Sequence, residues 1–555
     1  MKNDLRSKRP NILFAFADDW GRYASCYSRF ESNDSVNSSI HTPYIDRVAD
    51  NGVIFTEAFV PAPSCTPCRS SVLSGRYFWQ TGLGAILQGA VWDDRIPTFP
   101  QLLRQEGYHT GFSYKVWSPG NILDAPYGEV RASRYERAGN RFGLFSFDAM
   151  ENLESDSECN VEKAKKPLYD EVRQNFIDFI KDRNPEQPFC YWWGPTNTHR
   201  EWRKGSGKKL WGIEPDSLKG KMDSSLPDVH AIREDFADYL GECMAFDRGL
   251  GIILNELEKL GELQNTFIVV SGDHGIPGFP RAKCNLYDIG CKVSLMACWP
   301  GIIPPGTVDN DVVNIMDLAP TFLDAAGIVP PADMTAKSLL GRMKKRSLPG
   351  KNYIVMGRER HVASARDRGL PYPQRALRTK DFLYIRNFAP ERWPAGNPRG
   401  LDDPSVVPPA SDLLEHNTEV AYADMDASPT KAWCIHNRQK PGYWDLFNLG
   451  FGKRPEEELY ELVNDPNQMI NLNKSPAHVA DKERLADMLM QELIANDDPR
   501  VVQEICCFEQ SPYTDLDFPG NSTDELCRKD LLRLQKASMS SNAKRGLEMN
   551  DLTHK

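Results

Sequence analysis

The segment PNILFAFADDWG, residues 10–21, contains a short apolar run that ends abruptly in two acidic residues. The run, Asn11–Ala17, has seven residues and is followed directly by Asp18 and Asp19. The basic lead MKNDLRSKRP imitates a secretory leader, but the apolar part is too short and no small-residue cleavage site follows it. A strand buried on both faces of a parallel sheet has this continuous apolar pattern. We therefore interpret Asn11–Ala17 as the first strand of such a sheet.

Three later segments share this pattern, and helix-like stretches lie between them. Alternating strands and helices predict an α/β fold in which a large, mostly parallel sheet is sandwiched by helices. The predicted strands are Gly111–Tyr114, Pro188–Trp193 and Thr266–Val270, and the predicted helices are Tyr44–Asn51, Thr98–Glu106, Tyr169–Asp182 and Phe236–Leu260.

Polar residues follow each predicted strand. Lys115 follows the second strand, His199 lies shortly after the third, and Asp273 with His274 follows the fourth. In sheets of this kind the ligand site lies beyond the carboxyl ends of the strands. We therefore expect one active site, assembled from the first two-thirds of the chain.

A second structural pattern begins near residue 371. Arg375–Phe388 alternates around a turn-like Thr-Lys-Asp and predicts an antiparallel hairpin, and helical periodicity returns at His478–Ile494. Two insertions, Tyr127–Lys165 and Trp393–Trp444, are expected to shape a substrate pocket. We divide the chain into a catalytic domain at residues 1–370, a smaller C-terminal α+β subdomain with an antiparallel sheet at 371–500, and a C-terminal extension at 501–555 whose last twenty residues are polar and expected to be loose.

Composition narrows the class of protein. The 555 residues are 40% hydrophobic and 26% charged, with a net charge of −10, which argues against a general binder of nucleic acid or anionic membranes. No segment approaches the roughly 20 apolar residues of a membrane span. The thirteen cysteines form no regular framework, so most are expected to be reduced and buried. As the sequence stands, a cytoplasmic protein is expected, and the alternative is an exported mature form whose leader has been removed.

The segment SCTPCRSSVLSGR, residues 64–76, carries a Cys-x-x-Cys pair, Cys65 and Cys68. A thioredoxin-like site would place this pair in a compact unit of about a hundred residues, and the surrounding strand order and Arg-rich continuation do not supply that context. A zinc site would need a second ligand pair at suitable spacing, which the sequence lacks. The third interpretation gives only one of the two cysteines a chemical role.

That interpretation comes from a family resemblance. Cys-x-Pro-x-Arg followed by Leu-x-Gly-Arg resembles the maturation signal of the type I sulfatases, members of the alkaline phosphatase superfamily. In that family a maturation enzyme oxidises the first cysteine, here Cys65, to formylglycine (3-oxoalanine). The segments PNILFAFADDWG, HTPYIDRVADNGVIFTEAF, IVVSGDHG, KCNLYDIGCKV and EEELYELVNDPNQMINL resemble further landmarks, so that the resemblance spans about Pro10 to Leu472. Within the family, DHGIPGFP and RALRTKDFLYIRNF are more similar to the heparan N-sulfatase (sulfamidase) branch.

The resemblance implies a metal site with one calcium ion per chain. A sulfate ester is an anion, so a hard divalent cation held by carboxylates would neutralise its charge. A nitrogen ligand is unusual for so hard a cation, which leaves the identity of the metal open. The implied ligands are Asp18, Asp19, Asp273, His274 and the modified Cys65.

The resemblance also implies roles in the reaction. Lys115 and Lys283 would hold sulfate oxygens, His199 would protonate or orient the leaving oxygen, and Arg69 would support the aldehyde hydrate. One hydroxyl of the hydrate attacks sulfur, and deprotonation of the other then ejects sulfate and restores the aldehyde. A serine lacks this second hydroxyl, which explains why the family needs the modification.

The chain departs from the family at two positions. The family usually has Lys-x-His where this chain has Lys115-Val116-Trp117, and that histidine is assigned the base role in sulfate release. Trp117 cannot act as a base, and His361 is one candidate for its replacement. Cys68 stands where Ser or Ala is usual. Candidate substrate-binding residues are Trp117, Arg358, Arg360 and His361.

The sequence thus predicts a sulfatase that hydrolyses sulfate esters, or an N-sulfate, of a sulfated carbohydrate. Two alternatives stay open: a phosphonate or phosphate ester hydrolase of the same superfamily, and a non-catalytic homologue that binds sulfated glycans. The sugar, the sulfated position, endo or exo action and the oligomeric state do not follow from the sequence.

Overall fold

The computed structural model describes residues 9–31, 34–120, 133–345 and 352–510. The C-terminal twenty residues that were predicted to be loose, and the first residues of the insertion at 127–165, lie outside the described residues. Every cysteine in the described ranges is free, and all but Cys159 and Cys507 are buried, as expected from their irregular spacing.

The centre of the molecule is a seven-stranded sheet with the order β4-β5-β1-β6-β7-β2-β8. Its four strands β4, β5, β1 and β6 are parallel and correspond to the four predicted strands. The other edge is mixed, because β7 runs antiparallel to both β6 and β2. The bounds are β1 Asn11–Ala17, β2 Val53–Phe55, β4 His109–Tyr114, β5 Phe189–Gly194, β6 Thr266–Gly272, β7 Leu295–Cys298 and β8 Thr307–Asp309.

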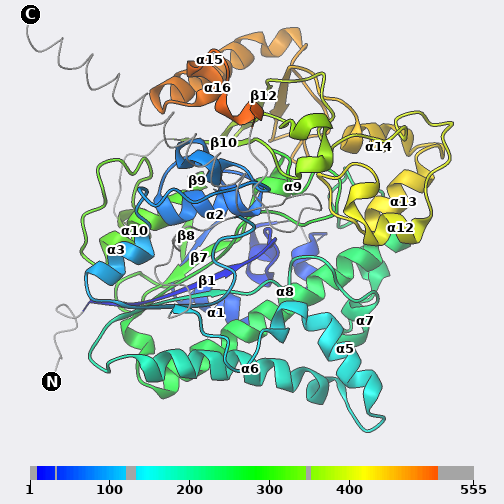
Figure 1. The fold of residues 1–555 in the computed structure, drawn as a ribbon. Coiled ribbons are helices and arrows are strands. Elements are labelled where there is room, and N and C mark those ends of the chain that lie inside the picture. Colours follow the sequence, from blue (N-terminus) through cyan, green and yellow to red (C-terminus); the bar gives the residue numbers. More distant parts are fainter. Residues whose placement is uncertain (1–8, 32–33, 121–132, 346–351, 511–555) are drawn as a thin grey trace, which may run out of the picture.

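The strand β1 separates two hydrophobic cores. Successive side chains of a strand point to opposite faces of the sheet, so Ile12, Phe14 and Phe16 enter one core and Leu13 and Ala15 the other. The first core is covered by α2 (Cys65–Ser74), α3 (Phe99–Gln105) and α10 (Leu318–Ala325), and the second by α6 (Val161–Asp182) and α8 (His230–Lys259) (Figure 1). This is the predicted sheet between helix layers.

The predicted helices are present with small differences in their bounds. The largest difference is in α6, which begins at Val161 rather than at Tyr169 because it includes Pro167. Pro167 is the seventh residue of α6, in the helix interior, where proline removes a backbone donor and is ordinarily unfavourable. The remaining elements are α1 Pro43–Asp50, α5 Phe145–Ser155, α7 Ser206–Trp211, α9 Asp288–Cys291, α11 Leu340–Met343, α12 Ser411–His416, α13 Pro429–Asn437, α14 Trp444–Phe451, α16 Pro499–Val502, β3 Ala58–Phe59 and β9 Val313–Asn314.

A separate antiparallel sheet has the order β10-β11-β12-β13. The predicted hairpin is present as β11 (Gln374–Thr379) and β12 (Phe382–Asn387), flanked by β10 (Tyr353–Arg358) and β13 (Glu457–Glu461). The helix α15 (Val479–Ala495) packs on β11 and β12 (Figure 1). The predicted domain boundary at residue 371 falls between β10 and β11, so this sheet takes one strand from the preceding region.

Within the described ranges, no helix combines the length and the apolar character needed to cross a bilayer.

Candidate active site

The predicted site residues meet at the carboxyl ends of the central strands. Asp18 and Asp19 follow β1, Asp273 and His274 follow β6, and Lys115 follows β4. The helix α2 begins at Cys65, and Gly75 ends it in the left-handed conformation (φ 65°) with its N–H bonded to the Ser71 carbonyl. Because residues four apart share one helix face, α2 presents Cys65 and Arg69 to the same cluster.

Arg69 connects the acidic residues that follow β1 and β6. Its Nε donates to Asp273 Oδ2 at 2.8 Å and its Nη2 to Asp18 Oδ1 at 2.9 Å. Its Nη1 donates to the backbone carbonyls of Lys115 and Val116. The guanidinium is fully buried, and a buried charge of this kind is stable only when it is paired and hydrogen-bonded. Arg69 therefore positions two carboxylates and the end of β4 at once.

Two lysines neutralise the aspartates at the end of β1. Lys115 Nζ donates to both carboxylate oxygens of Asp18 at 2.8 Å, and Lys283 Nζ donates to Asp19 Oδ2 at 2.9 Å. Burial raises the pKa of Asp18, but Lys115 and Arg69 outweigh it and hold that pKa well below its ordinary value. Lys283 is buried and the Lys115 side chain is only 11% exposed, so their charges are screened little by water.

Four side chains form a candidate metal site, namely those of Asp19, Cys65, Asp273 and His274, with ligand atoms all within 4.8 Å of one another. His274 Nε2 lies 3.0 Å from Asp19 Oδ1, 3.3 Å from Cys65 Sγ and 3.7 Å from Asp273 Oδ1. Two ligands of one calcium ion at right angles are about 3.4 Å apart. The spacing therefore fits a shared ion, and Asp18, Asp19 and His199 form a second such group beside it.

The chemistry of the donors also fits a cation. His274 Nδ1 lies 3.1 Å from the Gly275 carbonyl oxygen, which can only accept, so Nδ1 carries the proton and Nε2 keeps its lone pair for a ligand. Burial and the charge of Asp18 raise the pKa of the Cys65 thiol well above its ordinary value. In formylglycine, an oxygen would replace Cys65 Sγ, and oxygen is the harder donor that calcium prefers.

Strained backbone is present around the cluster. Asp19 has φ 55°, Tyr114 immediately before Lys115 has φ 67°, and Cys284 immediately after Lys283 has φ 69°. Residues other than glycine rarely adopt this left-handed conformation, and such strain persists where the surrounding structure enforces it, often at functional sites. Each of these residues sets the direction of a charged side chain in the site.

His199 lies at the open side of the site. Its side chain is 36% exposed, and its Nε2 lies 3.9 Å from Asp19 Oδ2. Its Nδ1 lies 2.5 Å from the Arg200 carbonyl oxygen. That oxygen is an acceptor, so Nδ1 is the protonated nitrogen of the neutral ring and Nε2 faces the cluster. The histidine is therefore placed where it could exchange a proton with a bound molecule.

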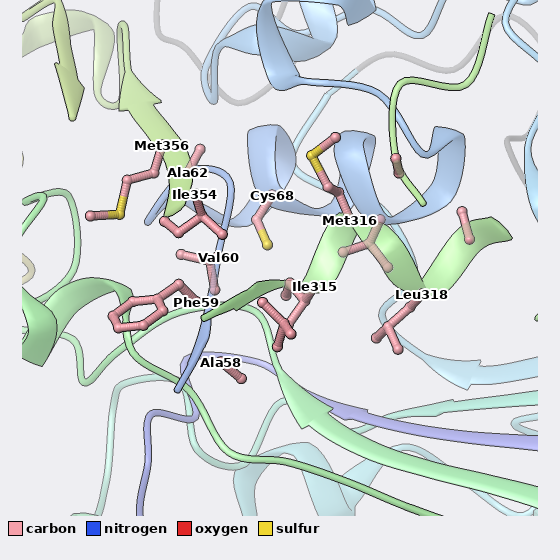
Figure 2. Close-up of a cluster of buried hydrophobic side chains, with 14 of the residues drawn as sticks. Ala58, Phe59, Val60, Ala62, Cys68, Ile315, Met316, Leu318, Ile354 and Met356 are labelled. Atoms are coloured by element: carbon pink, nitrogen blue, oxygen red, sulfur yellow. The ribbon is translucent and has the colours of Figure 1, made fainter. Parts of the chain in front are cut away.

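Cys68 and Trp117 are directed away from the cluster. Figure 2 shows Cys68 among Phe59, Val60 and Ile354 in the first hydrophobic core. Trp117 is 4% exposed, and its indole N–H donates to Ser70 Oγ of α2 at 2.8 Å. Cys68 thus extends from α2 into the hydrophobic core, and Trp117 packs against the helix from that core. The substrate-binding role suggested for Trp117 stays a prediction.

The remaining candidates come from the last residue of β10 and the loop that follows it. Arg358 donates to the Cys284 carbonyl oxygen and to Asp424, and Arg360 donates to the Gln88 carbonyl oxygen, so both guanidinium groups take part in buried contacts within the protein. Their role in substrate binding stays a prediction.

His361 contacts the residue that precedes Cys65. Its Nδ1 is 2.8 Å from Oγ of Ser64, the residue that directly precedes Cys65. Burial, together with the charge of Lys283, lowers the pKa of His361 to about 3, so the ring is neutral at physiological pH.

Two residues at the site were missed by sequence reasoning. Tyr239 of α8 donates its hydroxyl to the Asp19 carbonyl oxygen at 3.0 Å and fixes the end of β1. Asp426, from the insertion at 393–444, lies 3.4 Å from Lys283 Nζ. Tyr239 occurs in an ordinary amphipathic helix and Asp426 in a segment without periodicity, so no local signal marks either of them.

Comparison with known proteins places this geometry in a family. The family model described as Sulfatase matches residues 10–328. An ulvan-active sulfatase of Formosa agariphila is 26% identical over 494 residues, covering 87% of this chain and 80% of that protein. The human N-sulphoglucosamine sulphohydrolase is 26% identical over 533 residues, covering 89% and 92%.

A solved structure with a similar fold is a complex with its own substrate, D-glucosamine-2-N,6-O-disulfate. It has a TM-score of 0.57 and 19% sequence identity, and the alignment covers 90% of this chain and 100% of that one. At this identity the likeness concerns the fold. The family model, in contrast, matches more than half of the chain and includes both strand ends that carry the acidic residues. The chain therefore belongs to the sulfatase family.

Proposed function

We propose that this protein hydrolyses the sulfate group of a sulfated carbohydrate, with an O-sulfated glycan unit favoured and an N-sulfated glucosamine close behind. The observation that carries the proposal is the position of Cys65 at the start of α2, 3.3 Å from His274 and 3.6 Å from Asp19. The names of the relatives support a sulfated carbohydrate, because they include a sulfatase active on ulvan and a sulphohydrolase of N-sulphoglucosamine.

The residues of the chain would divide the work as follows. Lys115 and Lys283 would bind sulfate oxygens, since both ammonium groups already lie beside the carboxylates at the end of β1. Arg69 would hold Asp18 and Asp273 in place rather than contact the substrate, because all three of its nitrogens are engaged within the protein. In its imidazolium form, His199 would deliver the proton on Nε2 to the leaving atom from the open side of the site.

Cys65 would be converted to formylglycine by a separate maturation enzyme. Its hydrate supplies two hydroxyl groups on one carbon, one to attack sulfur and one whose deprotonation allows sulfate to leave. Calcium, held by Asp18, Asp19, Asp273 and His274, would neutralise the charge on the sulfate group. His361 is our candidate for the base that Trp117 cannot provide, because it contacts the residue preceding Cys65.

The decisive experiment couples maturation to activity. The protein is produced with and without a co-expressed maturation enzyme, and the mass of the peptide containing residue 65 is measured by mass spectrometry. Release of inorganic sulfate is then measured on defined sulfated mono- and disaccharides, with a phosphomonoester, a phosphodiester and a phosphonate ester for comparison. We expect sulfate release only from the protein that carries the aldehyde.

Two results would contradict the proposal. An unmodified thiol after co-expression with an active maturation enzyme, with sulfated glycans still bound, would favour a non-catalytic binding protein. A preference for phosphate or phosphonate esters over every sulfate would favour the other hydrolase class.

The cation is tested by stability rather than by turnover. Calcium at about 100 times its dissociation constant should stabilise the protein by about 2.7 kcal/mol, seen as a rise in melting temperature that a chelator reverses. Asp19→Asn should remove this rise. Asp412→Asn, whose side chain on α12 is 92% exposed, should preserve it.

A further inference from the structure

Asp426 brings a fourth carboxylate to the site from outside the segment that the family model matches. Its Oδ2 lies 3.4 Å from Lys283 Nζ, on an ammonium group that also donates to Asp19 Oδ2 at 2.9 Å. This Oδ2 is buried, yet it receives no hydrogen bond from any described residue. The side chain as a whole is 22% exposed. A buried acceptor without a donor is unfavourable, so this oxygen is suited to a donor that arrives with a ligand.

Asp426 is held in place by its neighbours along the chain rather than by its own carboxylate. Lys431 is fully buried and donates to three carbonyl oxygens of the preceding loop. Its acceptors are the carbonyls of Thr418 and Tyr422, both at 3.2 Å, and of Met425 at 2.8 Å. The backbone just before Asp426 is therefore fixed by a buried ammonium group.

A second anchor lies two residues before Asp426. Asp424 accepts from Arg358 at 2.5 Å and pairs with Arg366 at 2.7 Å, while its other oxygen accepts from the Val362 N–H at 2.9 Å. These contacts connect the loop that carries Asp424 and Asp426 to the segment 358–366, which includes His361. A binding group is effective when the surrounding contacts fix its position before the ligand arrives, and these contacts meet that condition.

The carboxylate is ionised and therefore an acceptor only. Burial raises the pKa of Asp426, but the charges of Lys283 and His199 outweigh burial and hold that pKa below its ordinary value. The same two residues are those that would contact the sulfate group and the leaving atom. Asp426 thus lies beside Lys283, one of the residues that would bind the sulfate group.

Resting on the proposed sulfatase function, we propose that Asp426 is a specificity-determining residue that accepts a hydrogen bond from an N–H or O–H group of the sugar next to the sulfate. The buried Oδ2, which lies beside Lys283 but accepts no hydrogen bond from a described residue, carries this inference. An aryl sulfate has no such donor, so the residue would favour sugar sulfates over aryl sulfates.

The same carboxylate adds one negative charge to the site. A sulfate ester carries one negative charge, whereas a phosphate monoester carries two at neutral pH. Asp426 would therefore repel the second charge of a phosphate monoester at short range, where water screens poorly. Removal of this charge should relax discrimination against phosphate monoesters.

The test compares substrates within one variant. Asp426→Asn keeps the shape of the side chain but removes its charge, and Asp412→Asn is the exposed control from the same insertion. The kcat/KM for glucosamine 2-N-sulfate and glucosamine 6-sulfate is divided by that for 4-nitrophenyl sulfate. In Asp426→Asn this ratio should fall about ten-fold or more for the sugar that presents the donor, mainly through KM. In Asp412→Asn it should stay at the wild-type value.

The two sugars separate the sources of the donor. A fall confined to glucosamine 2-N-sulfate identifies the N–H of the sulfated nitrogen, and a fall confined to glucosamine 6-sulfate identifies a neighbouring hydroxyl. An equal loss on sugar and aryl sulfates, or no change in the ratio, would overturn the proposal.

A binding measurement keeps this inference separate from the proposed function. The same three sulfates are titrated calorimetrically into the unprocessed protein, in which residue 65 is still cysteine. If processed wild-type protein releases no sulfate, the proposed function fails. The role of Asp426 would still be supported by a selective loss of sugar-sulfate affinity in Asp426→Asn, and overturned by its absence.

Discussion

Helix α2 places the same amino acid in two opposite environments, although Cys65 and Cys68 are only three residues apart. In the polar environment, Cys65 and Arg69 contact carboxylates, a histidine and backbone carbonyls. In the apolar one, Cys68 and Val72 pack in a hydrophobic core with Met316 (Figure 2). All ten residues of the helix are buried, so burial alone does not distinguish the two environments. The difference lies in whether the neighbours are charged.

The contacts of the two thiols, more clearly than the Cys-x-x-Cys spacing, indicate which cysteine takes part in a reaction and which only packs in the core. The thiol of Cys68 touches apolar side chains, where a free cysteine behaves as a small hydrophobic residue. The thiol of Cys65 lies among potential metal ligands, where an oxygen group could bind a cation. A redox pair would need both thiols to act together, whereas only the Cys65 thiol contacts polar side chains and Cys68 belongs to the hydrophobic core.

The comparison is tested most strongly by removing each thiol in turn. Cys65→Ala removes the residue to be modified, so sulfate release should fall about 1000-fold or more. Cys68→Ala should retain activity within a few-fold, because it only removes a sulfur atom from the core. Initial rates on a sulfated sugar, with protein from cells that contain the maturation enzyme, measure both effects.

Mass spectrometry is the control for this pair. The peptide of Cys68→Ala should still carry the aldehyde at residue 65, since the maturation signal keeps its Cys, Pro and Arg. If Cys68→Ala were as inactive as Cys65→Ala while fully modified, Cys68 would have a role in catalysis, and the interpretation that it only packs in the core would be wrong.

The second test concerns Arg69 and the two carboxylates that it pairs with. Arg69→Met would leave Asp18 and Asp273 without their shared buried partner, and breaking a buried ion pair costs about 3–5 kcal/mol. The free energy of unfolding from urea denaturation should fall by that amount. Arg69→Lys should recover part of the loss, because one ammonium group can pair with only one of the two carboxylates at a time.

An arginine on the surface provides the control for any general loss of stability when arginine is replaced by methionine. Arg95→Met removes a guanidinium that is 60% exposed and pairs with Asp93, and exposed pairs contribute about 0–1 kcal/mol. A loss for Arg69→Met as small as that for Arg95→Met would mean that the carboxylates do not depend on Arg69.

Much of the charged site around Cys65 and Arg69 could be predicted from the sequence. The strand β1 is apolar throughout and its predicted bounds agree with the structure, because a fully buried strand has a strong local signal. The spacing of Cys65 and Arg69 on one helix face then follows from helix geometry. The positions of Asp18, Asp273 and Lys115 follow from the rule that ligand sites lie at strand ends.

Other features have no local signal. The strands β2 and β8 have three residues each, too few for a pattern, so the mixed edge of the sheet was not predicted. Asp426 lies in a segment without regular periodicity, and only the tertiary contacts of Lys431 and Asp424 bring it to the site. Trp117 follows a strand like the other site residues, but its ring turns into the core instead.

The third test uses pH at the start of α2, where Ser64 contacts His361. The folded pKa of His361, about 3, is below the ordinary value of 6.5. The unfolded chain therefore binds a proton that the folded protein does not, and stability is lost as pH falls from about 7 toward 3. Between pH 7.5 and 4.5 this residue alone should lower the free energy of unfolding by about 2–3 kcal/mol.

The variant His361→Gln isolates this contribution. It should lose less stability than the wild type over the same pH range, because glutamine does not titrate. His230→Gln removes an exposed imidazole and should keep the wild-type pH dependence. Parallel curves for wild type and His361→Gln would show that His361 is accessible to protons in the folded state.

The smallest expected effect concerns Cys68 in its apolar surroundings. Cys68→Ser replaces a weakly polar thiol by a hydroxyl among apolar side chains, which costs about 1–2 kcal/mol when the hydroxyl finds no full partner. Part of the cost can be recovered, because a helical serine can bond the carbonyl four residues earlier, here that of Ser64. In unmodified protein, Cys65→Ser should change stability much less, since its neighbours Asp19 and His274 can pair with a hydroxyl. Chemical denaturation of the two serine variants, made in cells without the maturation enzyme, measures the difference directly. Equal losses for both would mean that the surroundings of the two thiols differ less in polarity than their contacts indicate.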